Sequence, residues 1–261
     1  GQVSMKNLLS DNIISYTDKS VTLETIIERI IIGGWPGLLE STTNEAMLLN
    51  QAYIDLIAKS DISRLSNIKR DPVRVMHLFR SIARNTATLA GKTTIVKDIK
   101  ESDNGEISRP TVKEYLDALE RLMIIENQPA WNTHIRSSAS LRKSPKIHFT
   151  DVSLSVAALG IDKESLLKDV KFTGFLFESL ATHELRVYAQ ANDAHVSHYS
   201  DSNGLEIDSI VQKRNGDWAA FEIKLGTSMI DEATSNLKKF TNSLDLEKTG
   251  QPKSLNVIVG T

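Results

Sequence analysis

The chain has 261 residues, of which 40% are hydrophobic and 25% charged, as in a globular protein of about two domains. Its net charge of -2 excludes an overall positive field that would draw it to nucleic acid or an anionic membrane, so such binding requires a local patch. The absence of cysteine excludes disulfides and thiolate metal sites, and the sequence shows neither a membrane-spanning stretch nor a signal-peptide pattern, which predicts a cytoplasmic protein without membrane contact.

The N-terminal part reads as helical. Apolar residues recur at helical spacing between residues 21 and 60, and the stretch GGWPGLLE at 33–40 interrupts them, which predicts two helices joined at a corner. A further helix is expected from Asp71 to Ala90, with Asp71 as N-cap and a proline at the first helical position. A short helix is expected over residues 94–100.

The next segment has the order of a winged helix-turn-helix. Ser108 is placed to cap a helix whose apolar residues share one face, and this helix leads into a short strand at 123–126. Arg109 and Lys113 lie on its outer face and are candidate contacts to nucleic acid. Acidic residues interleave with them, which favours a solvated or protein-contacting face over a groove reader.

A change of composition follows Pro129. The stretch HIRSSASLRKSPKIH carries cations without any acid, namely Arg136, Arg142, Lys143 and Lys146. Such a run favours contacts to phosphates, the alternative being a flexible linker. We place a boundary here and expect three consecutive domains: a helical segment at 1–65, the winged helix at 66–133 and an α/β domain at 134–261.

The C-terminal part alternates helices and strands. Asp151 is placed to cap a short helix ending at Leu159. The elements expected after it are a helix at 174–190, strands at 195–199, 205–213 and 218–225, a helix at 231–244 and a strand at 254–260. Their order is α-β-β-β-α-β.

Charged side chains lie on two of these strands, which otherwise read as buried. Strand alternation places Glu206 and Asp208 on one face, and Glu222 and Lys224 on one face of the next strand. A tight hairpin at NGD, residues 215–217, would bring them together.

Neighbouring carboxylates repel one another unless a cation lies between them, and Mg²⁺ prefers such oxygen ligands. A bound Mg²⁺ polarises a phosphoryl oxygen, and Lys224 is placed to position water or stabilise developing charge. The pattern therefore predicts a site for phosphodiester hydrolysis, with cross-strand ion pairs as the alternative interpretation.

The preceding helix offers a further acid to this site. At 100° per residue, Glu184 falls within the apolar arc of the helix and Glu178 at its edge, so either is placed to face the sheet. The alternative is that both are satisfied by neighbouring side chains or backbone.

Asp208, a hairpin and Glu222-Ile223-Lys224, after a helix with an inward Glu, resemble the PD-(D/E)XK nuclease superfamily, which has an α-β-β-β-α-β core. A longer series of motifs is similar to a large prokaryotic family of AAA+-like ATP-binding proteins whose C-terminal region is a domain of unknown function. These motifs are GGWPGLL, RSIARNTATLAGKTTIVKDI, SRPTVKEYLDALERLMII, KSPKIHFTD, GFLFESLATHEL, LEIDSIV and FEIK.

The resemblance implies a helical and winged-helix N-terminal half followed by an α/β restriction-endonuclease-like domain with a mixed central sheet. It also implies that an ATPase domain precedes these parts, that residues 21–60 are the remainder of its helical lid, and that this chain is a C-terminal fragment. The first residues, GQVSM, which lack an initiator Met, agree with that expectation.

Site residues carry over by motif. The resemblance implies Glu178 as the first acid with Glu184 as competitor, Asp208 as the second, Glu222 with Lys224 as the third motif, and Glu206 as a ligand or supporting acid. It implies Mg²⁺ or Mn²⁺ as cofactor and DNA or RNA as substrate. Ser209 stands where the family has a bulky apolar residue.

Two further points complete the expectation. Many members of the superfamily bind without cutting, so the alternative is an inactive interaction module that binds a protein or nucleic acid and regulates the ATPase. The segment AGKTT at 90–94 resembles a phosphate loop, but Thr86 stands where the first glycine of that motif belongs and no strand leads into it. We therefore expect no nucleotide site in this chain, and the oligomeric state is left open.

Overall fold

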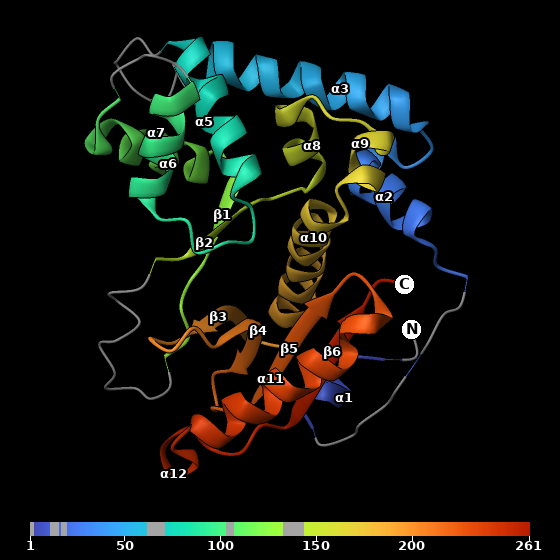
Figure 1. The fold of residues 1–261 in the computed structure, drawn as a ribbon, viewed down its shortest axis with the longest axis vertical. Helices are drawn as coiled ribbons and strands as arrows, with labels where there is room; N and C mark the ends of the chain where they lie inside the picture. Colours follow the sequence, from blue (N-terminus) through green and yellow to red (C-terminus); the bar gives the residue numbers. More distant parts are fainter. Residues whose placement is uncertain (1–2, 11–15, 17–19, 62–70, 103–106, 133–143) are drawn as a thin grey trace. The chain divides into compact units, whose positions relative to one another are not determined.

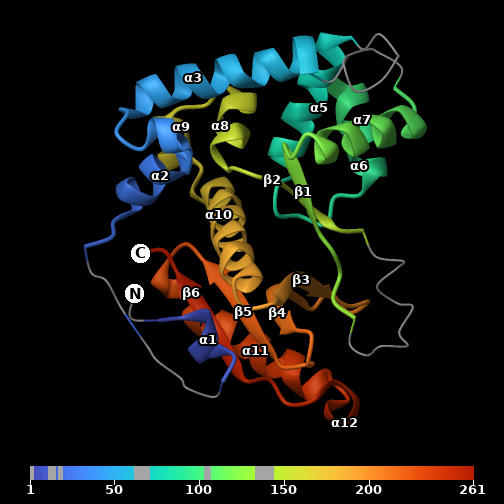
Figure 2. The ribbon, with the colours of Figure 1, turned by 180° about the vertical axis from the view of Figure 1, so that it is seen from behind.

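The computed structural model describes residues 3–10, 16, 20–61, 71–102, 107–132 and 144–261 (Figures 1 and 2). Two compact units make up the chain. The helical unit contains residues 24–127 and 146–179, and the sheet unit contains 1–23, 128–145 and 180–261. This division differs from the three consecutive domains expected from the sequence, because residues 146–179 group with 24–127.

The helical unit begins with two helices and a corner, as the sequence predicts. Helix α2 covers Leu23–Ile32, the 3-10 turn η1 covers Pro36–Leu38, and helix α3 covers Thr43–Leu56 and continues as a π-helical turn, η2, at Ile57–Asp61.

Hydrogen bonds to one carboxylate hold the corner between α2 and α3. Asp151 accepts from the Gly34 N–H at 2.8 Å and from the Ser153 N–H at 2.9 Å. Gly33 has φ +78°, and a Cβ there would lie 2.4 Å from Asp151 Oδ1. Glycine is therefore required at this position for both its conformation and its close approach.

Three helices and two short strands follow. They are α5 at Pro72–Arg84, α6 at Lys92–Ser102, α7 at Arg109–Arg121, β1 at Ile125–Gln128 and β2 at Lys146–Phe149. Strands β1 and β2 form a two-stranded sheet. The AGKTT segment opens α6 and follows a helix and a turn, not a strand.

Two of the three expected N-caps are confirmed, whereas the helix that begins at Ser153 has Val152, and not Asp151, at its N-cap. Asp71 accepts from the Val73 N–H at 3.0 Å and Ser108 accepts from the Thr111 N–H at 3.2 Å. Helix α5 ends at Arg84, six residues earlier than predicted, because Asn85 closes its last turn with a 2.9 Å hydrogen bond to the Ser81 carbonyl.

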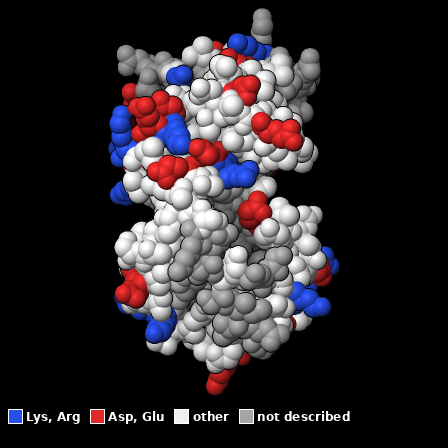
Figure 3. Space-filling model, turned by 90° about the vertical axis from the view of Figure 1, so that its right-hand side faces the viewer, with Lys and Arg blue, Asp and Glu red and all other residues white. Residues whose placement is uncertain are grey.

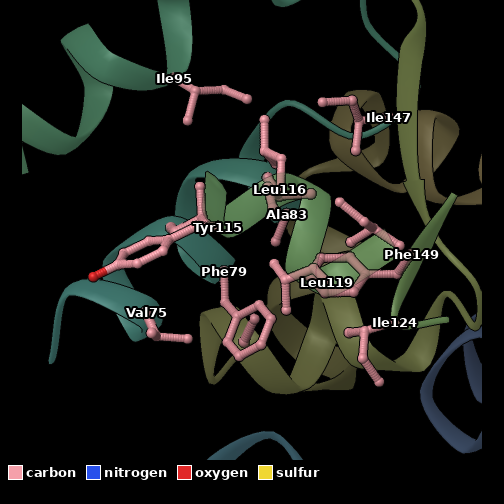
Figure 4. Close-up of a cluster of buried hydrophobic side chains, with 14 of the residues drawn as sticks. Val75, Phe79, Ala83, Ile95, Tyr115, Leu116, Leu119, Ile124, Ile147 and Phe149 are labelled. Atoms are coloured by element: carbon pink, nitrogen blue, oxygen red, sulfur yellow. The ribbon is translucent and has the colours of Figure 1, made fainter. Parts of the chain in front are cut away.

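A single apolar core joins these elements (Figure 4). Phe79 of α5 is fully buried and lies 6.0 Å from Phe149 of β2, measured between ring centroids. Leu119 of α7 and Leu154 of α8, a helix at Ser153–Leu159, belong to the same core. Helix α9 covers Lys163–Lys168.

Helix α10, Val170–Gln190, contributes residues up to 179 to the helical unit and the remainder to the sheet unit. The strands of the sheet unit are β3 at Ala194–Ser200, β4 at Glu206–Lys213, β5 at Trp218–Lys224 and β6 at Ser254–Val259. They are ordered β3-β4-β5-β6, antiparallel except for the parallel pair β5-β6. The predicted element order and the mixed sheet are confirmed.

The remaining elements of the sheet unit are helical. Helix α11, Ile230–Ser243, connects β5 to β6, and the short elements are α1 at Met5–Leu8, η4 at Thr227–Met229 and α12 at Leu246–Thr249. Among the described residues, no helix combines the length and apolar character needed to cross a membrane.

The four-stranded sheet has two different faces. Ile210 and Trp218 pack with Phe240 of α11 in an apolar cluster. On the other face, Ser209 pairs with Phe221 across β4 and β5, and Ser209 contacts Thr182 of α10. The sheet therefore has an apolar face against α11 and a face with buried polar groups against α10.

We predict that Phe79→Ala lowers the free energy of unfolding by about 3 to 5 kcal/mol, because it leaves a cavity in the centre of the core of the helical unit. Chemical denaturation followed by circular dichroism measures the change. Val73→Ala on the same helix is the matched control, since Val73 is exposed and should change stability by less than about 0.5 kcal/mol. Equal effects of the two substitutions would contradict the assignment of the core.

Candidate functional site

The candidate site begins at a β-bulge in β4. Ser197 of β3 faces Ile210, whereas Tyr199 faces Ile207, so Asp208 and Ser209 together oppose the single residue His198. The bulge interrupts strand alternation, and Ile207 and Ile210 consequently join the same apolar cluster. Regular strand alternation would place Asp208 and Ile210 on one face, and the bulge separates them.

Asp208 is held by two donors from β5. Its Oδ2 accepts from the Ile223 backbone N–H at 2.7 Å and from Lys224 Nζ at 3.1 Å. The hairpin that brings β4 and β5 together turns at residues 214–216, where the Lys213 N–H donates to the Asp217 carbonyl at 2.8 Å. The expected convergence of Asp208, Glu222 and Lys224 is therefore observed.

Glu222 is the most buried member of this group, at 1% exposure. Lys224 Nζ lies 2.5 Å from Glu222 Oε2, but neither Glu222 oxygen has a hydrogen-bond partner of good geometry among the described residues. Burial and then the Asp208 carboxylate raise the pKa of Glu222 to about 8, and the ammonium of Lys224 offsets only part of this. The raised pKa favours the protonated form of Glu222 near pH 7.

Lys224 lies between the two acids, with a side chain that is 17% exposed. Burial acts to lower the pKa of Lys224, but Asp208 and Glu222 outweigh it and hold that pKa above its ordinary value. Lys224 is consequently a permanent cation at physiological pH.

A buried polar network supports the bulge, and sequence reasoning missed it. Gln128 Nε2 donates to the Asp208 carbonyl at 2.9 Å and to Ser209 Oγ at 3.0 Å. Thr182 Oγ1 of α10 lies 3.3 Å from Ser209 Oγ, and all three side chains are fully buried. The network explains the serine at position 209, because a bulky apolar side chain would leave these groups unpaired.

Glu178 belongs to the helical unit, where it forms an ion pair with Lys146 of β2. Lys146 Nζ donates to Glu178 Oε1 at 2.7 Å, and both side chains are buried. His148 of β2 makes a parallel contact, with Nδ1 at 3.0 Å from Ser179 Oγ. Lys146 is therefore a buried structural cation, which corrects the expectation that it offers its charge to nucleic acid.

The remaining predicted acids are exposed. Glu184 of α10 and Glu206 at the start of β4 both lie on the surface. The helical arc predicted to face the sheet included Val187 and Tyr188, which are also exposed, so the inward face of α10 is rotated toward Ala181, Leu185 and Ala189. Of the two acids that the sequence offered to the sheet, Glu184 is therefore exposed. Across the described residues, no three His, Asp or Glu side chains are grouped to hold a metal ion.

The predicted nucleic-acid contacts are only partly described. Arg136, Arg142 and Lys143 lie outside the described residues. Arg109 is exposed on α7, and Lys113 is exposed but paired with Asp117 at 2.5 Å. On the face shown in Figure 3, the described Lys and Arg residues lie among Asp and Glu and form no large patch of one sign.

Comparison with known families adds to this description. The model of a domain of unknown function, DUF8612, matches residues 23–165, which is more than half of the chain. The chain belongs to the DUF8612 family. Residues 173–259 of this DUF8612 protein match a second domain of unknown function, DUF4143, which is commonly associated with AAA ATPases. No curated protein and no solved structure matches the chain.

The DUF4143 match contains the whole candidate site of the DUF8612 protein, since Asp208, Glu222 and Lys224 all lie within it. The two matches meet between residues 165 and 173, at the start of α10, and not near residue 134 where the sequence composition changes. The AAA+ link expected from the resemblance is thus supported at the level of domain association.

We predict that the stability of this DUF8612 protein falls with rising pH because of Glu222. Between the ordinary pKa of 4.5 and the raised value of about 8, the unfolded chain has lost this proton and the folded chain retains it, so raising the pH favours unfolding. The stabilisation from protonated Glu222 is fully present below its unfolded-state pKa and is lost above its folded-state pKa. At about 1.4 kcal/mol per unit, a loss on the order of 1 to 5 kcal/mol is expected.

Denaturant unfolding at a series of pH values checks this prediction. Glu222→Gln should flatten the decline, whereas Glu232→Gln, at an exposed position on α11, should retain it. The same slope in wild type and Glu222→Gln would contradict the raised pKa.

We also predict that Gln128→Leu costs about 1 to 3 kcal/mol of unfolding free energy, because the Asp208 carbonyl and the Ser209 hydroxyl lose a buried donor. Gln190→Leu, at an exposed position, is the control. In a double-mutant cycle with Ser209→Ala, the two losses should be non-additive by about 0.5 kcal/mol or more. Simple additivity would show that the network is not a unit.

Proposed function

We propose that the sheet unit carries a cation-dependent phosphodiesterase site for DNA or RNA, at Asp208, Glu222 and Lys224. The observation that carries the proposal is the convergence of two buried carboxylates and a lysine at the bulge, with both Glu222 oxygens lacking a hydrogen bond among the described residues. Buried ionisable groups with strongly shifted pKa values recur where a site is prepared for a ligand or ion.

The donor set fits a hard divalent cation. Carboxylate oxygens are the ligands that Mg²⁺ and Mn²⁺ prefer, and Asp208 and Glu222 are the residues that would hold such an ion. The ion supplies Lewis-acid polarisation of a phosphoryl oxygen when bound. Exposure disfavours both Glu184 and Glu206 as further ligands, and Glu178 is paired with Lys146 in the helical unit.

The protein's own residues have distinct tasks in this proposal. Lys224 stays protonated, so it stabilises negative charge on the phosphate and does not serve as a general base. The Ile223 N–H fixes the orientation of the Asp208 carboxylate, and Gln128 fixes the backbone that carries it. Glu222 would lose its proton when it holds the divalent cation.

The DUF4143 match suggests which kind of protein contains this site. Because the DUF4143 region is commonly associated with AAA ATPases, we propose that the site works beside an ATPase domain in the same protein. The order of three helices and two strands from α5 to β2 supports a winged helix, which would hold the substrate or a partner.

Cleavage of a panel of single-stranded, duplex and branched DNA and RNA in Mg²⁺ or Mn²⁺ tests the proposal. Lys224→Ala and Asp208→Ala are expected to lose about 100-fold or more of the cleavage rate, since each removes a group that faces the reacting phosphate. Lys239→Ala and Asp231→Ala, exposed on α11, are matched controls that should retain full activity. Circular dichroism establishes that each variant is folded. Equal cleavage by wild type and Lys224→Ala would refute the proposal.

A second candidate is an interaction module that retains the fold without catalysis. The position of Lys224 favours it, because Nζ lies 3.1 Å from Asp208 and 2.5 Å from Glu222 and so balances the charge without a metal ion. Titration calorimetry with Mg²⁺ and Mn²⁺ separates the two candidates. Heat of binding that disappears in Asp208→Ala supports the phosphodiesterase, and no heat together with no cleavage supports the interaction module.

A further inference from the structure

Helix α3 exposes an apolar stripe on its outer side. Leu48 is 73% exposed, Leu49 54% and Leu56 53%, and Ala52 between them is exposed as well. Ala46, on the opposite side of the helix, is buried. Helix α3 runs past α8 in the helical unit (Figure 1). Isolated exposed leucines are ordinary, but a contiguous apolar stripe indicates a surface that binds something.

The stripe has a regular geometry. At 100° per residue, the exposed residues of α3 from Glu45 to Leu56 fall within an arc of about 100°. The members of this arc are Glu45, Leu48, Leu49, Ala52 and Leu56. The exposed Lys59 follows within one turn, in the π-helical extension η2.

Two pairs of positions are arranged symmetrically about Ala52, whereas the position symmetric to Leu49 is Asp55. Leu48 and Leu56 lie four residues to either side of Ala52, and the charged residues Glu45 and Lys59 lie seven to either side. A two-fold axis at Ala52 therefore places leucine against leucine and glutamate against lysine. The small side chain of Ala52 at the centre permits close approach of two helix backbones.

We propose that the α3 surface binds a second copy of this chain, with the two α3 helices antiparallel across Ala52. Across this axis Leu48 and Leu56 match in polarity and Glu45 and Lys59 match in charge, while Leu49 lies opposite Asp55. Such self-complementarity is the requirement for a two-fold interface between identical subunits. This inference is independent of the phosphodiesterase site.

The flanking charges are available for such contacts. Glu45 caps α3 by accepting from the Thr42 N–H at 2.9 Å and the Thr42 hydroxyl at 2.8 Å, and both hydrogen bonds use Oε2, so Oε1 remains for a lysine of the second copy. Lys59 lies 3.8 Å from Asp55, and both side chains are exposed. An exposed pair of this kind is worth little, so Lys59 exchanges it at small cost.

The size of the surface sets the strength of association. One helix of fourteen residues from each copy gives a small interface, in the class below about 1,200 Å² that forms weak and transient complexes. A hollow of about 290 Å³ beside the stripe, lined by Trp35, Leu38 and Tyr53 among others, adds apolar surface. We therefore expect a monomer–dimer equilibrium that depends on concentration.

Sedimentation equilibrium of the full chain from micromolar to submillimolar concentration tests this. Leu48→Glu and Leu56→Glu should each weaken the dimer about tenfold or more, equivalent to about 1.4 kcal/mol. Val187→Glu, at an exposed valine on α10, should leave the dimer unchanged. A wild-type chain that stays monomeric throughout would assign the stripe to some other partner and overturn the proposal.

A charge-reversal experiment tests the antiparallel arrangement. Glu45→Lys alone and Lys59→Glu alone each create two like-charge pairs across the interface, so each variant should dimerise more weakly than wild type. An equimolar mixture restores two opposite-charge pairs and should associate more strongly than either variant alone. Circular dichroism establishes that α3 remains folded in both, and a mixture no stronger than its components would overturn the proposed pairing.

Discussion

The β-bulge at Asp208 and Ser209 is the constraint on which the candidate site depends. By placing two residues opposite His198, it turns Asp208 toward β5 and removes its carbonyl from the regular ladder. The fully buried Gln128 donates a hydrogen bond to that carbonyl, and Ser209 and Thr182 complete the network. The position of one carboxylate thus depends on residues from three separate parts of the chain.

Charge balance decides between the two functions proposed for this site. Lys224 lies between Asp208 and Glu222, and its ammonium offsets part of the effect that raises the pKa of Glu222. A cation that binds here would have to replace the proton of Glu222. The same residues are therefore compatible with both proposals, the nuclease and the ion-pair cluster that binds no metal. The nuclease and the ion-pair cluster would share one backbone arrangement and differ in the ionisation of Glu222.

Local patterns predicted most of the fold, and distant contacts account for what they missed. The helices, the four strands and the caps at Asp71 and Ser108 follow from periodicity and from residues three or four apart. Lys146 appeared to be a surface cation because its partner Glu178 lies on another element. The sequence could not decide whether Glu184 faces the sheet, because no local contact fixes the rotation of α10 about its axis. Gln128 gave no signal, because it acts on residues 80 and 81 positions away.

The pairing of β5 has a consequence for the order in which the site is built. The ladder between β4 and β5 reaches only as far as Ser209 and Phe221, whereas Glu222, Ile223 and Lys224 pair with Val257, Ile258 and Val259 of β6. During synthesis β6 is the last of the four strands to emerge. Until then, no backbone ladder fixes the segment that carries Glu222 and Lys224, and its contact with β4 is through the Asp208 side chain. A nascent chain can therefore complete its helical unit before this segment is fixed.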